Sequence, residues 1–373
     1  MSAYWHPLSA VYLEEPPMRA STVALRMLLS GEGGARVRYG GDRMWPALRH
    51  GQSLRVVPLA ERGPVAGEVV LAVEGGIPDL LRVESAAEDV AVAADSGDKT
   101  SWTVSPRDIL GRMAESPRRG RFGSWHRVWL DVREAWTGRP DAESDPAESV
   151  RDKYDEQAVF YARSDAPPLD PALASRIAAS VTRGGRVLVA GSGTGREAFA
   201  LEAMGFEVAG IDFSPRMVEI ARAAATERGS RAAFVAADLR RHEERENALA
   251  AVVFTYDVYS FLPSAPARLD VLSRLARALA PGGALFLSAR RRSKPGDLVV
   301  LTIQWLAALL RGRRSAWGDS HTRWLDGDGR LRRSFVHVFT PRALDAELAR
   351  AGFELVDWKG GHGHYRFAGG ARA

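Results

Sequence analysis

Cysteine is absent from the 373 residues, and lysine is rare. Without cysteine the chain has no disulfide, no thiolate metal site and no cysteine nucleophile, which suits a reducing compartment, so we expect a cytoplasmic protein. Arginine supplies nearly all of the basic charge, because only residues 99, 153, 294 and 359 are lysines. Since 46 acidic residues are interspersed with 51 basic ones, the net charge of +5 predicts no nucleic-acid partner.

The sequence also lacks an apolar run long enough to cross a bilayer. The longest, LVVLTIQWLAALL at 298–310, has 13 residues and contains Thr302 and Gln304. A membrane-spanning helix needs about 20 apolar residues, so this run predicts a buried or interfacial helix and no membrane span. Residues 1–17 show no basic segment followed by an apolar one, so we expect no signal peptide.

Length and composition predict two domains. The stretch TGRPDAESDPAES is rich in Pro, Asp, Ser and Glu and has almost nothing to bury, which is typical of a linker. We therefore expect a domain at 1–136, a linker at 137–150 and a second domain at 151–373. Between 20 and 115, short β-like runs such as ARVRY and EVVLAV alternate with Gly and Pro turns, which predicts a smaller, mostly-β domain.

The segment SWHRVWLDVREAW at 124–136 is predicted to be an amphipathic helix. One face would carry Trp125, Val128, Trp129, Val132 and Trp136. We favour a bridging helix packed on a domain. Attachment to a membrane surface is the alternative, and the acids within the helix weaken it.

Beyond the linker, apolar strands alternate with helices. Strands are predicted at 186–190, 207–212, 232–238, 248–257 and 283–289, with a hairpin at 353–369. Helices are predicted at about 196–205, from Ser214-Pro215 onward, and at about 264–280. Such repeated β-α units indicate an α/β fold in which a doubly wound parallel sheet is covered on both faces.

The first of these strands runs into a glycine loop, RVLVAGSGTGREAF. The glycines allow a sharp turn and a close approach to a ligand, and the helix that follows offers unpaired N–H groups. A dinucleotide-binding fingerprint requires a small residue at the sixth position, counted from the first glycine. This chain has Arg196 there, so dinucleotide binding is disfavoured. Asp212 ends the second strand, placed to accept the hydroxyls of a ribose, and Asp238 ends the third, placed to accept from an adenine amino group.

These segments resemble the class I S-adenosylmethionine-dependent methyltransferases. The resemblance rests on VLVAGSGTGR, VAGIDFSPRMVEIARA, FVAADL, ALAPGGALFLSAR and FTPRALDAELARAGFELVDW, in that order. It covers roughly 151–373 and implies a Rossmann-like, seven-stranded sheet with S-adenosyl-L-methionine as the cofactor. One position departs from the family pattern: Val189 stands where an acid commonly precedes the loop, which would weaken cofactor binding.

The resemblance also implies which residues bind the cofactor. The glycines would line its methionine end, Asp212 would hold the ribose, and Asp238 with Leu239 would frame the adenine. YDEQAVFYA resembles the helix that closes over the cofactor, which makes Tyr154 and Tyr161 candidate contacts. The full set predicted to bind the cofactor is Tyr154, Ala190, Gly191, Ser192, Gly193, Gly195, Asp212, Phe213, Asp238, Leu239 and Thr255.

Candidate catalytic residues are Tyr256, Asp257 and His337. Tyr256 and Asp257, with Tyr259, follow the fourth strand at the sheet edge where ligands of such folds bind; the alternative is a helix cap and two core tyrosines. His337 would alternate with valines in a strand, so a structural histidine is the favoured alternative. No metal site is expected, because the HGH sequence near the C-terminus has no third ligand nearby.

The front domain resembles the signal-peptidase-like β fold over roughly 20–115. The segment VRYGGDRMWPALRHG carries Arg43 where that family has its nucleophilic serine, and Leu81 stands at the position of the general base. Neither side chain can perform that chemistry, so we expect a catalytically inactive domain. Such a fold would either present a peptide by strand addition or serve as a scaffold, and we favour the scaffold.

The sequence therefore predicts methyl transfer from S-adenosylmethionine to an oxygen, nitrogen or carbon of an acceptor, with a small molecule favoured. A peptide presented by the front domain is the alternative acceptor. A non-catalytic binding or regulatory protein is a second interpretation, supported by Val189 and Arg43. A protease is the third and weakest.

Overall fold

The computed structural model describes most of the chain beyond residue 144: residues 145–162, 169–292, 295–312, 315–326, 331–359 and 361–368. Nearer the N-terminus it describes residues 11–13, 18–19, 25, 29, 34–39, 44, 47–48, 52–59, 63–74, 77–93 and 101–117. The predicted helix at 124–136 and Arg43 lie outside the described residues.

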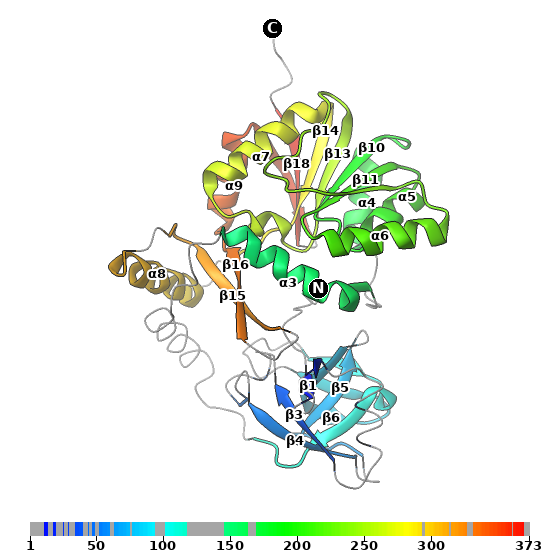
Figure 1. Cartoon of the computed structure of the whole chain (residues 1–373), viewed down its shortest axis with the longest axis vertical. Helices are drawn as coiled ribbons and strands as arrows, with labels where there is room; N and C mark the ends of the chain where they lie inside the picture. The colour runs from blue at the N-terminus through cyan, green and yellow to red at the C-terminus, as the bar shows by residue number, and fades with distance from the viewer. Residues whose placement is uncertain are drawn as a thin grey trace. The chain divides into compact units, whose positions relative to one another are not determined.

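The chain divides into two compact units (Figure 1). The N-terminal unit contains Tyr4–Gly138 and Arg323–Arg333. The C-terminal unit contains Arg139–Thr322 and Ser334–Ala373, with Met1–Ala3. The division is therefore not made at a single point of the sequence, because a short segment beyond 322 groups with the front unit.

The N-terminal unit is a nine-stranded sheet in the order β2-β1-β3-β4-β9-β5-β6-β7-β8. Its strands are β1 (Val11–Leu13), β2 (Met18–Arg19), β3 (Ala35–Tyr39), β4 (Ser53–Val57), β5 (Val69–Glu74), β6 (Ile77–Ala86), β7 (Val90–Ala93), β8 (Ser101–Val104) and β9 (Ile109–Met113), with a short 3-10 helix, η1 (Pro106–Asp108). In β3 buried and exposed residues alternate, which gives one face to the core. Leu71 and Leu80 belong to one apolar core of this unit, and Val70 and Leu81 to another.

The C-terminal unit is built on a seven-stranded sheet in the order β12-β11-β10-β13-β14-β18-β17. Its strands are β10 (Arg186–Ala190), β11 (Glu207–Asp212), β12 (Ala233–Ala236), β13 (Leu249–Phe254), β14 (Leu279–Leu287), β17 (Phe353–Lys359) and β18 (His362–Phe367). The first five strands of that order pair in parallel, and β18 is antiparallel to both of its neighbours. The predicted Rossmann-like α/β sheet is therefore confirmed.

Helices cover both faces of this sheet (Figure 1). The helices of this unit are α3 (Pro146–Ala162), α4 (Pro171–Ser180), α5 (Arg196–Ala203), α6 (Pro215–Arg228), α7 (Ala265–Ala278), α8 (Pro295–Leu310) and α9 (Pro341–Arg350), with a 3-10 helix, η2 (Val258–Phe261). Residues of α4, α5 and α6 pack in one apolar cluster, and those of α7 and α9 in another. Because both faces are covered, a central strand such as β13 is apolar almost throughout.

The helix starts follow from local sequence. Asp170, Ser214 and Thr340 each accept a hydrogen bond from the third residue of the helix that follows, and each precedes a proline. Such a cap satisfies one of the unpaired N–H groups of a helix and contributes about 1 kcal/mol. The predicted start of α6 at Ser214-Pro215 is confirmed.

Two expectations need correction. The last residues of the predicted linker are helical, because Asp145 accepts from the Ala147 N–H (3.0 Å) and α3 begins at Pro146. The predicted strands also omitted β15 (Asp319–Leu325), which pairs with β16 (Leu331–His337) in a two-stranded sheet. Acidic and serine residues that suit a linker also cap a helix, and composition does not distinguish the two.

Candidate functional site

The glycine loop follows β10 and leads into α5. Gly191, Gly193 and Gly195 all have positive φ angles, of 76°, 52° and 88°. A Cβ atom on Gly191 would lie 2.4 Å from Val258, and one on Gly195 would lie 2.8 Å from Phe234, so both positions exclude a side chain. A Cβ on Gly193 would meet nothing within 4 Å. The loop therefore presents open space at its central glycine.

Asp212 connects this loop to the start of α6. One carboxylate oxygen accepts from the Gly193 N–H (2.8 Å) and the other from the Ser214 N–H (2.9 Å). Burial raises the pKa of Asp212 to about 6, although these two hydrogen bonds oppose the shift. Each oxygen keeps a further lone pair, so the carboxylate can accept hydrogen bonds from a ligand.

Helix α3 lies across the end of the sheet at which the parallel strands terminate (Figure 1). Asp155 fixes it there by accepting from the Ser214 hydroxyl (2.5 Å) and the Arg216 N–H (3.2 Å). The Tyr154 ring packs 5.7 Å from those of Tyr161 and Phe261. Burial raises the pKa of Tyr154 well above its ordinary value, so the phenol is neutral.

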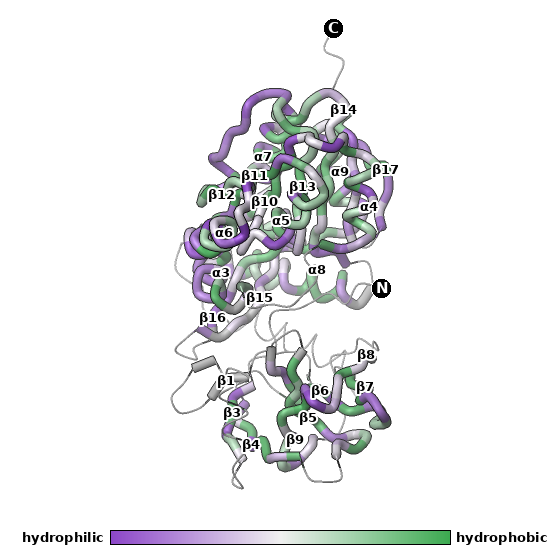
Figure 2. Tube along the Cα trace, turned by 90° about the vertical axis from the view of Figure 1, so that its right-hand side faces the viewer, coloured by the Kyte–Doolittle hydropathy of each residue, from purple (hydrophilic) through white to green (hydrophobic). Residues whose placement is uncertain are grey.

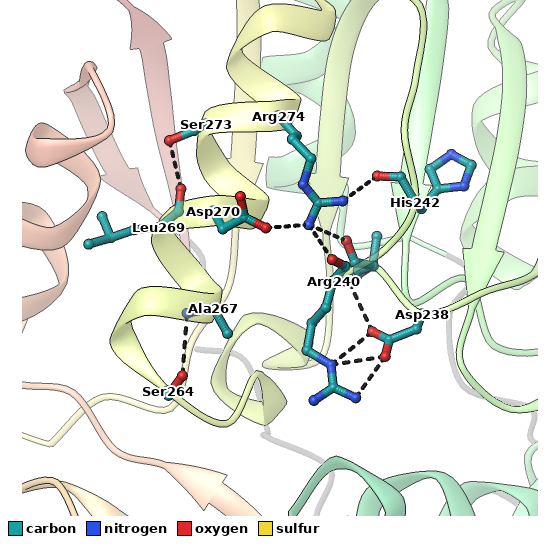
Figure 3. A network of polar contacts seen from close by, with 10 residues as sticks. Asp238, Arg240, His242, Ser264, Ala267, Leu269, Asp270, Ser273 and Arg274 are labelled. Atoms are coloured by element: carbon teal, nitrogen blue, oxygen red, sulfur yellow. Dashed lines mark hydrogen bonds and ion pairs between the residues drawn. The ribbon is translucent and has the colours of Figure 1, made fainter. Parts of the chain in front are cut away.

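Asp238 is already engaged by Arg240 (Figure 3). The guanidinium donates Nε to Oδ1 and Oδ2 (3.1 and 2.9 Å) and Nη2 to Oδ2 (2.7 Å). Arg240 also pairs with Asp145 just before α3, at 2.6 Å. Partial burial raises the pKa of Asp238, but the hydrogen bonds from Arg240 outweigh it and hold the pKa below 3.8. The sequence reasoning overlooked this arginine, although it lies two residues from the acid.

Helix α7 holds the loop that carries Asp238 in place. Arg274 donates to the carbonyl oxygens of Leu239, Arg240 and His242, at 3.1, 2.7 and 2.6 Å (Figure 3). Asp270, one turn earlier on α7, holds the same guanidinium at 2.9 Å. The position of Asp238 is therefore determined by tertiary contacts.

Asp257 lies at the end of β13 in a left-handed conformation (φ 61°) and is buried. Its N–H donates to the Ser288 hydroxyl (2.8 Å), and Oδ2 lies 3.2 Å from Arg290 Nε. Oδ1 has no hydrogen-bond partner. Burial raises the pKa of this carboxyl, with Arg290 opposing the shift. Asp257 does occupy the N-cap position of η2, as the structural alternative predicts, but its side chain makes no capping hydrogen bond there.

Its neighbour Tyr256 is exposed, and the Arg196 guanidinium lies 5.0 Å from the centre of its ring. Arg196 Nε in turn contacts the buried Glu197 carboxylate at 3.0 Å. Partial desolvation of its hydroxyl, together with the nearby Glu197 carboxylate, raises the pKa of Tyr256 to about 12. Tyr259, by contrast, is a core residue whose hydroxyl donates to Glu347 (2.6 Å).

His337 is buried at the end of β16. Its Nδ1 lies 2.7 Å from Asp319 Oδ1, and its ring packs against Phe339. The Phe339 N–H donates to the Arg290 carbonyl oxygen (2.8 Å). This links His337 to the segment that pairs with Asp257, and it leaves both the structural and the catalytic interpretation open.

Several buried polar atoms near the glycine loop have no partner. They are the Gln157 side-chain amide, Ser192 Oγ, Thr255 Oγ1 and Asp257 Oδ1. An unpaired buried polar group costs about 1–3 kcal/mol, so a ligand or an ordered water is expected to supply the missing bond. The residues present therefore fit a polar ligand at this edge of the sheet. Among the described residues, no three His, Asp or Glu side chains are grouped so as to hold a metal ion, and no helix is long and apolar enough to cross a membrane.

Comparison with known proteins gives the following similarities. Residues 187–283 match the family model of the methyltransferase domain. The chain is 31% identical over 180 residues to demethylmenaquinone methyltransferase of Thermus thermophilus, a match that covers 46% of this chain and 74% of that enzyme. It is 32% identical over 113 residues to the ubiquinone biosynthesis O-methyltransferase of Vibrio cholerae, covering 30% of this chain and 44% of that enzyme. Among solved structures, the DhpI-SAM-HEP complex is 21% identical with a TM-score of 0.45, covering 61% of this chain and 99% of that chain.

The match to the Thermus enzyme extends over most of that protein, whereas the chain spans less than half of the Vibrio enzyme. The family model falls within the C-terminal unit, from β10 into β14. The chain therefore belongs to the class I S-adenosylmethionine-dependent methyltransferases, through its C-terminal unit.

Proposed function

We propose that this enzyme transfers a methyl group from S-adenosylmethionine to an oxygen, nitrogen or carbon of a small molecule. The carrying observation is the set of unpartnered buried polar atoms beside the glycine loop, on Gln157, Ser192, Thr255 and Asp257. The names of the relatives support a small acceptor, because they describe enzymes of demethylmenaquinone methylation and ubiquinone biosynthesis.

We assign cofactor binding to Tyr154, Ala190, Gly191, Ser192, Gly193, Gly195, Asp212, Phe213, Asp238, Leu239 and Thr255. When bound, the cofactor supplies an electrophilic methyl group on a sulfonium. The open space at Gly193 leaves room for the ligand beside the backbone, and Asp212 offers its remaining lone pairs to the ribose hydroxyls. Gln157, which the sequence reasoning missed, joins this set because both of its buried amide atoms are unpaired.

The Asp238 carboxylate would accept a hydrogen bond from the adenine amino group, through lone pairs that do not already accept from Arg240. The bidentate pair fixes the direction of the carboxylate before the ligand arrives. The guanidinium groups of Arg151 and Arg240 lie 5.6 and 6.0 Å from the centre of the Phe213 ring. Both arginines thereby hold that aromatic ring at the adenine end of the site.

Asp257 is the favoured general base on the acceptor side. Arg290 orients one of its oxygens and leaves Oδ1 without a partner, and burial raises its pKa toward neutrality. Tyr256, with a pKa of about 12, would donate a hydrogen bond to the acceptor. His337, oriented through Nδ1 by Asp319, is the second candidate base. A base is needed only where the acceptor loses a proton early.

The test is methyl transfer with a labelled cofactor. The full chain is incubated with methyl-labelled S-adenosylmethionine and a bacterial extract, and the products are separated into macromolecular and small-molecule fractions. We expect label in small molecules, and none with the Asp212→Ala variant. Label in peptide or protein would contradict the proposed acceptor class. Cofactor binding without transfer to any fraction would support the non-catalytic interpretation.

A further inference from the structure

Helix α8, inserted between β14 and β15, exposes an unusually apolar surface. Ten large hydrophobic side chains are exposed among the described residues, and four of them belong to α8. They are Val299, Leu306, Leu309 and Leu310, with exposed fractions of 52%, 46%, 44% and 75%. Figure 2 shows the hydropathy of this helix, whose sequence from Leu298 to Leu310 contains no charged residue.

Three of these side chains form one stripe together with the partly exposed Ile303. Val299, Ile303, Leu306 and Leu310 are spaced by four, three and four residues, which places them on one helical face. We call these four residues the α8 stripe. Leu301, on the opposite face, is buried, and so is Ala307 at the side of the stripe. The Trp317 indole N–H also donates to the Thr302 hydroxyl (3.1 Å), which attaches the helix to the loop before β15.

Basic residues flank the helix at both ends. The segment from Arg291 to Arg314 contains six, Arg291, Arg292, Lys294, Arg311, Arg313 and Arg314, and one acid, Asp297. Its net charge is therefore +5, equal to the formal charge of the whole chain. An uncharged apolar face between two basic clusters is the pattern of a helix that lies in the plane of an anionic membrane surface.

We propose that α8 docks on the surface of an anionic lipid bilayer, with the α8 stripe inserted among the acyl chains. Acidic headgroups complement the +5 segment, whereas a second copy of the same face would bring like charges together. The helix has 16 residues, fewer than a span requires, so it lies along the surface. This inference is independent of the methyl acceptor.

Vesicle sedimentation tests the proposal with the full chain. The probes are vesicles of phosphatidylcholine alone and of phosphatidylcholine with an equal amount of phosphatidylglycerol. We expect binding to the mixed vesicles only, weakened by 0.5 M salt. The double variant Leu306→Asp, Leu310→Asp should bind roughly tenfold more weakly or worse, because it removes two inserted side chains and adds repelled charges.

A matched control is Leu355→Asp with Val356→Asp on β17, which makes the same change at two other exposed positions. Its vesicle binding should equal that of the native protein. Calorimetry with S-adenosylmethionine shows that each variant is folded, and it tests the proposed function separately. No binding of the native chain to mixed vesicles, or equal loss in both double variants, would overturn the proposal. So would a native dimer in sedimentation velocity that only the α8 variant dissociates, since the stripe would then be a protein interface.

Discussion

Each unit of this chain buries an apolar sheet, but the two units treat their buried polar groups differently. In the N-terminal unit the buried Arg82 donates to the carbonyl oxygens of Gly67 (2.6 Å) and Pro117 (2.9 Å), and buried Asp79 accepts from the Leu80 N–H. Among the described residues of this unit, two buried side-chain atoms have no hydrogen-bond partner, Arg112 Nε in the nine-stranded sheet and Trp324 Nε1 on β15. In the C-terminal unit Arg274 Nε on α7 and Ser334 Oγ on β16 are also unpaired, but several such atoms, on Ser192, Thr255 and Asp257, lie where the parallel strands end.

This difference indicates that the two sheets have different roles. A sheet that serves only stability pairs its buried polar groups internally, because each unpaired one costs free energy. A sheet that binds a ligand keeps some of them for the ligand. Leu81, at the position where the front-domain resemblance expects a general base, is fully buried in the core of its unit. This supports our proposal that the N-terminal unit is a scaffold without peptidase chemistry.

The largest effect is expected from the substitution Asp212→Ala in the ligand-binding C-terminal unit. We expect S-adenosylmethionine to bind about 100-fold more weakly, because the ribose loses its acceptors and the Gly193 and Ser214 N–H groups lose theirs. Isothermal calorimetry measures the loss. The control is Glu207→Ala at the exposed start of the same strand, which should bind normally. Near-normal affinity in the Asp212 variant would contradict the assigned site.

Substitutions in the glycine loop sharpen the comparison. Gly195→Ala should lower the free energy of unfolding by about 3 kcal/mol, since its Cβ would meet Phe234 and Phe199 at 2.8 and 2.9 Å and its φ is positive. The Cβ of Gly193→Ala would meet no atom within 4 Å, so this change should lower the free energy of unfolding by only about 1 kcal/mol. It should nevertheless weaken cofactor binding. Gly67→Ala, an unobstructed positive-φ glycine of the N-terminal unit, is the stability control. Chemical denaturation distinguishes the three.

The pH dependence of cofactor binding should follow Asp212. Its pKa is raised to about 6, so affinity should be constant above pH 7 and fall about tenfold at pH 5, as the carboxylate takes up a proton. The stability of the ligand-free protein should change with pH in the opposite direction. A raised pKa means that the folded state binds the proton more tightly, so this group's contribution is greatest below pH 3.8 and is lost as the pH rises through 6. Calorimetry from pH 5 to 8 checks the first trend, and a flat profile would contradict it.

The smallest effect is expected from a serine-directed fluorophosphonate probe. The native chain should show no labelling above a heat-denatured sample, because Arg43 and Leu81 stand where the front-domain resemblance would place the serine nucleophile and the general base. If the probe labels the native chain and a single serine substitution removes that labelling, the N-terminal unit is not an inactive scaffold.

Much of the C-terminal fold was predictable from sequence. The apolar strands and the Ser214-Pro215 helix start are local signals, and each matches an observed element. The start of α3 was not predictable in the same way, because Asp145 and Pro146 suit a linker and a helix cap equally. The pairing of Asp238 with Arg240 and Asp145 also escaped prediction, since Asp145 lies more than 90 residues away in sequence.

The sequence by itself determined the order of strands and helices, the glycine loop and the acids that follow it. Those features depend on local periodicity and on residues that only certain backbone conformations accept. Tertiary structure alone decided which polar atoms stay unpaired. Asp257 forms an ion pair with Arg290 through Oδ2 and has no hydrogen-bond partner at Oδ1, whereas the Tyr259 hydroxyl, two residues later, donates to Glu347 in the core. The physical reason is that a hydrogen bond needs two groups within about 3 Å, and chain folding, not sequence spacing, brings distant residues that close.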